Sequence, residues 1–75
     1  METINFPAAI MQLLEHAGVR GLSVDLAIHK ARVYDIEWEP DLVLGHFDRL
    51  ERAGQLLYRK GYYRLKKYER FQHFI

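Results

Sequence analysis

The chain has 75 residues, of which nearly half are hydrophobic and 28% are charged, and it contains no cysteine. This composition is typical of a folded domain, and a single domain of this size buries only about 60% of the surface of its unfolded chain. Without cysteine the chain forms neither disulfide bonds nor thiolate metal sites. No apolar run approaches the roughly 18 residues of a membrane span, and no signal-peptide pattern is visible, so we expect a cytoplasmic protein.

The charges are divided unevenly along the chain, although the net charge is only +1. Residues 1–47 contain three Lys or Arg and seven Asp or Glu, which gives −4, whereas residues 48–75 contain eight and three, which gives +5. A basic C-terminal third on an acidic body is typical of a protein that binds a polyanion. It also fits two oppositely charged surfaces that attract each other within the molecule or between copies.

Local signals predict a first helix over residues 6–17. Asn5 is suited to capping its N-terminus, Pro7 lies in the opening turn where no N–H is needed, and Gly18 is suited to ending it. Apolar residues recur on one helical face, at Ile10, Leu13, Leu14 and Ala17. Residues 19–22 are too few for a helix, and we interpret them as a short strand.

A second helix is predicted over residues 24–33. Ser23 is a good N-cap, and Asp25 lies in the first turn, where the helix dipole favours a negative charge. The expected inward face consists of Val24, Ala27, Ile28, Ala31 and Tyr34. Residues 34–39 then form a turn, in which Trp38 is expected to pack over the junction with the next helix.

A third helix is predicted over residues 40–53, with Pro40 in its first position and Gly54 ending it. Its inward face, at helical spacing, consists of Val43, Phe47 and Leu50. Two short β-rich segments follow at 55–59 and 62–65, and Lys60-Gly61 between them suits a two-residue hairpin loop.

The last segment, residues 67–75, does not indicate one conformation. Tyr68, Phe71 and Ile75 share one helical face, but a continued strand fits as well. Because exposed apolar clusters usually mark contacts, we expect Phe74 and Ile75 to dock on the core or on a second copy.

This order of elements resembles the winged helix-turn-helix family of bacterial, archaeal and phage DNA-binding proteins over residues 6–66. The segment Val43, His46-Phe47, Arg49 to Gly54 and Leu56-Leu57 is similar to the recognition helix of that family and its exit into the wing. The resemblance implies one winged-helix domain over residues 1–75, mostly α with a small β-hairpin (α+β), with a wing at 55–66. It also implies a role in transcriptional or phage-type regulation.

In this family the third helix enters the major groove of duplex DNA, and the wing lies along the backbone or minor groove. By resemblance, Arg59, Lys60 and Arg64 would contact phosphates. Their neighbours strengthen the hypothesis, because the hairpin alternates basic residues with tyrosines that can stack on bases, and Lys66 and Lys67 follow it. The alternative is an exposed hairpin whose charges keep it soluble and prevent edge-to-edge pairing.

The outward face of the third helix does not have the composition of a base reader. With Val43 and Phe47 inward, a spacing of 100° per residue places Asp41, Gly45, Asp48 and Arg52 outward, with Arg49 beside them. Base edges are usually read by Arg, Lys, Asn or Gln. We therefore expect weak base readout, with an ion pair between Asp48 and Arg52 and with Arg49 and Arg52 available to phosphates.

The remaining polar residues do not indicate catalysis or metal binding. Four histidines are scattered along the chain without a paired spacing, and the only serine is the expected N-cap at position 23. We expect no enzyme activity, no metal and no cofactor. His46 borders the apolar face of the third helix, where it can pack at the edge of the core or contact a phosphate.

Two hypotheses follow from these patterns. The first is a small winged-helix protein that binds double-stranded DNA through its hairpin and third helix, with the Tyr68–Ile75 segment as a candidate homodimer interface. The second is a winged-helix module that binds another protein. Its contact surface would consist of Asp41, Asp48, Phe71, Phe74 and Ile75.

Overall fold

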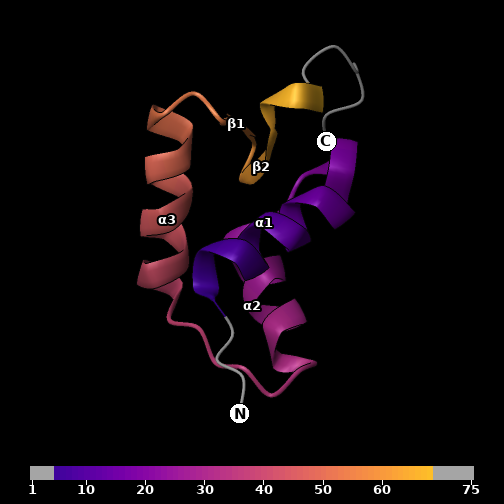
Figure 1. Cartoon of the computed structure of the whole chain (residues 1–75), viewed down its shortest axis with the longest axis vertical. Coiled ribbons are helices and arrows are strands. Elements are labelled where there is room, and N and C mark those ends of the chain that lie inside the picture. Colours follow the sequence, from indigo (N-terminus) through magenta and orange to yellow (C-terminus); the bar gives the residue numbers. More distant parts are fainter. Residues whose placement is uncertain (1–4, 69–75) are drawn as a thin grey trace.

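The computed structural model describes residues 5–68. Three helices, α1 (Phe6–Ala17), α2 (Val24–Arg32) and α3 (Pro40–Arg52), precede an antiparallel hairpin of β1 (Leu56–Arg59) and β2 (Tyr62–Leu65). Two short 3₁₀ turns, η1 (Gly18–Arg20) and η2 (Lys66–Tyr68), follow α1 and β2. In Figure 1 the hairpin lies between the end of α3 and the end of α1, with α2 below α1. The fold is mostly helical α+β with a winged helix-like layout, as the sequence predicts.

The helix starts follow from the caps that the sequence indicates. The Asn5 side chain accepts a hydrogen bond from the Ala8 N–H at 3.3 Å, and Ser23 Oγ accepts one from the Leu26 N–H at 3.0 Å. Each bond satisfies a backbone donor that the first turn leaves without a helical partner. Pro40 lies in the first turn of α3, where its missing N–H costs no helical bond.

The helix ends agree with the prediction to within one residue. α1 spans the predicted 6–17, whereas α2 and α3 each end one residue early, with Val33 and Ala53 as their C-terminal caps. Terminal turns are the part of a helix that local signals fix least well. After α3, Gly54 has φ 81°, the left-handed conformation expected of a glycine that ends a helix.

The hairpin confirms the predicted loop. Lys60 and Gly61 have φ values of 52° and 88°, which match the two positive φ angles of a type I′ turn. The cross-strand pairs run from Leu56–Leu65 at the open end to Arg59–Tyr62 at the turn.

The prediction of a strand over residues 19–22 is wrong in extent. Gly18 and Gly21 have φ values of 58° and 84°, which break the segment into a 3₁₀ turn and leave one extended residue. That residue, Leu22, donates to the Tyr63 carbonyl at 2.7 Å and accepts from the Tyr63 N–H at 2.9 Å. This isolated bridge places β2 between Leu22 on one side and β1 on the other.

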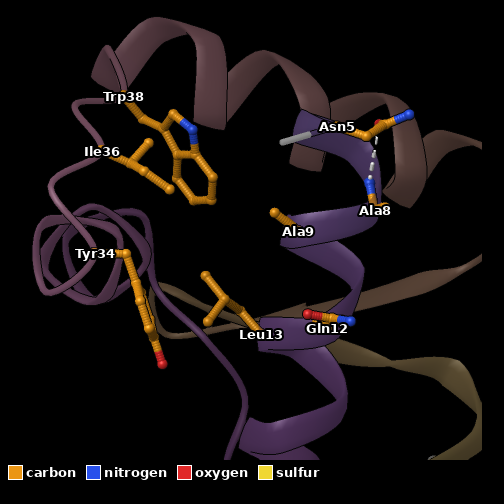
Figure 2. A pocket seen from close by; sticks show the side chains of 8 residues that line it. All are labelled: Asn5, Ala8, Ala9, Gln12, Leu13, Tyr34, Ile36 and Trp38. Carbon is orange, nitrogen blue, oxygen red and sulfur yellow. Dashed lines mark hydrogen bonds between the residues drawn. The ribbon is translucent and has the colours of Figure 1, made fainter. Parts of the chain in front are cut away.

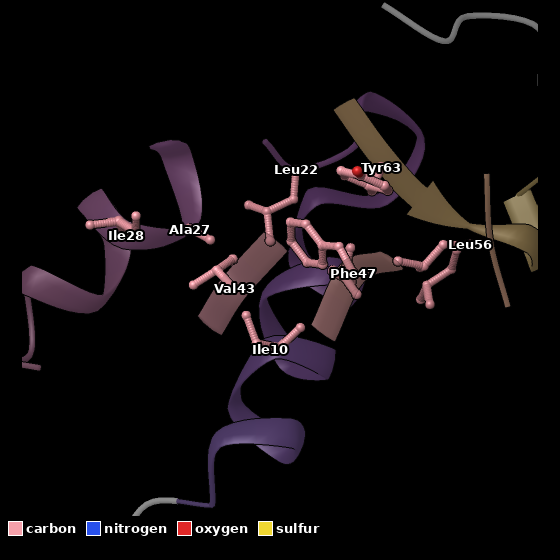
Figure 3. Close-up of a cluster of buried hydrophobic side chains, with 10 residues drawn as sticks. Ile10, Leu22, Ala27, Ile28, Val43, Phe47, Leu56 and Tyr63 are labelled. Carbon is pink, nitrogen blue, oxygen red and sulfur yellow. The ribbon is translucent and has the colours of Figure 1, made fainter. Parts of the chain in front are cut away.

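The core lies where α1, α2, α3 and the hairpin meet (Figure 3). Phe47 of α3 is fully buried, and its ring lies 4.6 Å from the Tyr63 ring of β2. The other fully enclosed large side chains are Ile10, Leu14, Leu22 and Val43. Burial of such side chains is worth about 1.5–3 kcal/mol each, so this junction stabilises the attachment of the hairpin to the helices.

Tyr34 lies outside the core, contrary to the prediction, whereas Trp38 packs against the core as predicted. Tyr34, expected on the inward face of the second helix, is 71% exposed, because α2 ends at Arg32 and Asp35 at φ 61° reverses the chain. Trp38 is partly buried beside the junction of α2 and α3, and its ring contacts the Phe6 ring edge-on at 5.0 Å.

Gly45 gives a test of how the exposed face of α3 is built. A Cβ at this position would meet no atom within 4 Å, so Gly45→Ala should raise the free energy of unfolding by about 0.5–1 kcal/mol through helix propensity. Gly61→Ala is the matched control. It should lower that free energy, because alanine is strained at φ 88°. Urea denaturation measures both changes, and a destabilised Gly45→Ala would contradict this structure.

Candidate nucleic-acid interface

The hairpin tip presents two basic side chains to solvent. Arg59 ends β1 and Lys60 lies in the turn, and both are exposed. Within residues 5–68, neither side chain forms an ion pair. Their charges are therefore available to an anionic ligand, as the sequence suggests.

Arg64 corrects the expected set of wing contacts. The residue is only 4% exposed, and its Nη1 donates to the Val19 carbonyl of η1 at 3.4 Å. Its burial follows from the position of β2, which is covered by η1 on the side from which Arg64 projects. Arg64 therefore ties η1 to the hairpin instead of presenting its guanidinium to a phosphate.

The two faces of the hairpin differ in chemistry, which the linear alternation of basic and aromatic residues does not reveal. Paired residues on antiparallel strands point to the same side. Tyr58 and Tyr63 share the face toward α3, with ring centroids 4.8 Å apart, whereas Arg59 and Tyr62 share the opposite face. Burial raises the pKa of Tyr63, with smaller contributions from nearby acidic groups, whereas Tyr58 remains 53% exposed.

Lys67 is engaged at the start of the C-terminal segment. Its Nζ lies 2.7 Å from Glu15 Oε2 of α1, and the Tyr68 hydroxyl donates to Glu15 Oε1 at 3.3 Å. The hydrogen bond from Lys67 is the main cause that lowers the pKa of Glu15, and the same bond raises the pKa of Lys67. η2 is thus held against α1, and Lys66, its first residue, is exposed.

The outward face of α3 is arranged as the sequence predicts. Asp48 and Arg52 form an ion pair at 3.2 Å, and Asp41 and Arg49 are exposed. The sequence analysis missed two apolar residues on this helix, Leu42 and Leu44, which are each 47% exposed. At a helical period of 3.6 residues, these two positions lie on the two sides of α3, between its inward and outward faces. The period alone therefore places them outside the core.

His46 lies on the side of α3 that faces α1. Its ring is partly buried and lies 5.2 Å from the Phe6 ring. Burial, with a smaller contribution from Arg49, lowers the pKa of His46 below its ordinary value of 6.5, so the ring is neutral at pH 7. This arrangement favours a packing role over the phosphate contact expected as an alternative.

An apolar hollow of about 440 Å³ separates α1 from the loop that follows α2. Figure 2 shows Leu13, Ile36 and Trp38 around it, with Tyr34 at its rim. No charged side chain is among its lining residues, so the hollow adds no positive charge to the candidate interface.

Three predicted site residues, Phe71, Phe74 and Ile75, lie outside the described residues. Within residues 5–68, no three His, Asp or Glu side chains come together as metal ligands, and no helix is long and apolar enough to cross a bilayer. Comparisons with models of protein families, with curated proteins and with solved structures find no match to this chain.

The burial of His46 predicts a pH dependence of stability. Because its pKa is lower in the folded state, the unfolded state binds more protons below about pH 6.5, and the free energy of unfolding should fall as the pH drops through this window. His46→Gln should reduce that fall, measured by urea denaturation between about pH 7.5 and about pH 5.5. His29→Gln, at an exposed site, is the control. An unchanged pH slope in His46→Gln would contradict the assigned burial.

Proposed function

We propose that this protein binds double-stranded DNA, with its β-hairpin on the phosphate backbone. The observation that carries the proposal is the exposed tip of Arg59 and Lys60, which no carboxylate among residues 5–68 neutralises. Cations on a projecting hairpin reach phosphates and release condensed counterions. The resemblance to winged helix-turn-helix proteins extends the proposal to transcriptional or phage-type regulation.

Helix α3 would add phosphate contacts more readily than base readout. Arg49 is exposed, and Arg52 is held only by a solvent-exposed pair with Asp48. Such pairs are weak, so Arg52 can exchange its carboxylate for a phosphate. Asp41 and Asp48 oppose close approach of the helix to a groove, which makes binding dependent on charge more than on sequence. A homodimer would double the phosphate contacts.

The proposal predicts strongly salt-dependent binding to random duplex DNA. Affinity measured by fluorescence anisotropy should fall steeply between about 50 and about 200 mM salt. The double variant Arg59→Gln with Lys60→Gln should weaken binding and reduce the log–log salt slope by about 2, because each lost phosphate contact removes about one unit.

Arg32→Glu is the matched control for charge, since it also changes the net charge by two units. It lies at the end of α2 distant from the hairpin (Figure 1) and should leave the salt slope unchanged. Failure of the wild-type protein to bind duplex DNA at about 50 mM salt would overturn the proposal.

A second candidate function, docking on another protein, is favoured by the surface of α3. Leu42 and Leu44 are exposed, and on the helix surface they flank the face that contains Gly45. Asp41 and Asp48 lie on that face with Gly45. Gly45 has no role in the packing of the domain, and its missing side chain would let a partner approach the helix backbone. A partner that fits would combine apolar and basic side chains.

Under this candidate, Asp41→Lys should abolish capture of a partner by the immobilised protein, whereas Glu37→Lys in the preceding loop should not. Glu37 is the control because it is also exposed and carries the same charge. Duplex DNA should then show no binding at low salt. Retained capture by Asp41→Lys would exclude α3 as the docking surface.

A further inference from the structure

A second basic cluster forms from residues that the charge count assigns to the acidic part of the chain. His16, Arg20 and Lys30 line one hollow of about 360 Å³ beside the hairpin, and Tyr62 of β2 completes its wall. The other lining residues are Ala17, Gly21 and Leu26, so no carboxylate lies among them.

Three element ends bring these side chains together. His16 lies in the last turn of α1, Arg20 ends η1, and Lys30 lies in the last turn of α2. A cation in the last turn of an α-helix is favoured by the helix dipole, which accounts for the position of Lys30 alone. The dipole does not explain why all three surround one hollow.

The charges of this hollow are not neutralised by the rest of the described structure. Within residues 5–68, Arg20 and Lys30 take part in no ion pair. Glu15, next to His16 in the sequence, is engaged with Lys67 and Tyr68.

The buried Arg64 adds to the positive field on the same side of the hairpin. Its guanidinium donates a hydrogen bond to the Val19 carbonyl, which fixes η1 and thereby the position of Arg20. Arg64 is thus a positioning residue for this hollow.

The hollow is continuous with the hairpin tip. Tyr62 forms its wall, and the cross-strand partner of Tyr62 is Arg59, whose side chain projects on the same face. The basic surface therefore extends from the tip toward η1 and α2, on the face of the hairpin turned away from α3. On the face toward α3, Tyr58 and Tyr63 line another hollow together with Leu44 of α3 and Asp25 of α2.

We infer that the hollow of His16, Arg20, Lys30 and Tyr62 binds a phosphate of the nucleic-acid backbone. The inference rests on the proposed function and deepens it, because it adds a phosphate contact on the η1 face of the hairpin to those proposed for the hairpin tip and α3. Arg20 supplies a planar fork of donors, Lys30 an ammonium and Tyr62 a hydroxyl, a set that suits phosphate oxygens.

The test is a ¹H–¹⁵N titration of the protein with a short random duplex, together with affinities of paired variants. Amide shifts should concentrate at Arg20, Gly21, Lys30 and Tyr62. Arg20→Gln with Lys30→Gln should weaken duplex binding by about tenfold or more and reduce the salt slope by about 1, because the hollow neutralises one phosphate.

Arg49→Gln with Arg52→Gln on α3 is the matched control, since it removes the same charge from the opposite side. It should weaken binding less than the hollow variant. Tyr62→Phe keeps the ring and removes only the hydroxyl, so it should cause a smaller loss without unfolding. Thermal melting verifies that each variant is folded.

The outcomes separate the two proposals. If duplex binding persists in the Arg20 and Lys30 variant but is lost in the α3 variant, the hollow is overturned and DNA binding stands. If the wild-type protein does not bind duplex DNA, the proposed function fails, and a titration with inorganic pyrophosphate decides the hollow alone. Shifts at Arg20, Lys30 and Tyr62 would then support a phosphate site, and their absence would overturn it.

Discussion

One pair of backbone hydrogen bonds, between Leu22 and Tyr63, sets the architecture of this domain. The two bonds place Leu22 alongside β2. In the resulting minimal three-stranded arrangement, β2 lies between Leu22 and β1. A lone hairpin is marginally stable in water, and this attachment lets Tyr63 and Leu65 enter the core beside Phe47. Without the bridge, the hairpin would rest on α3 and α1 through side chains alone.

The same bridge decides where positive charge reaches the surface. It brings η1 against one face of the hairpin, where Arg64 becomes buried and Arg20 is held at the rim. The other face is closed by the aromatic contacts of Tyr63 with Phe47 and Tyr58. A hairpin that looks uniformly basic and aromatic in the sequence therefore has one electropositive side and one aromatic side.

The helices and the hairpin were predictable because their signals lie between near neighbours in the sequence. The distribution of charged side chains between core and surface was not, because it depends on contacts between distant residues. Asn5 and Ser23 mark helix starts through bonds within a few residues, and Pro40 marks one through its fixed φ and missing N–H. Their helices are therefore predicted to within one residue at each end. The burial of Arg64 depends on a partner 45 residues away in sequence, and no periodicity encodes it. The hollow brings together His16, Arg20, Lys30 and Tyr62. These residues come from four different elements, and no spacing in the sequence links them.

The conformation of Lys60 has a consequence for how this domain would respond to engineering. A lysine at φ 52° occupies a region that glycine or asparagine adopts at lower cost, so the turn gives up some stability to hold an ammonium at the outermost point of the hairpin. Screening variants for heat resistance alone would favour replacing this lysine. The most heat-stable variants would then have the weakest positive charge at the tip. Thermal stability and attraction for polyanions would therefore change in opposite directions.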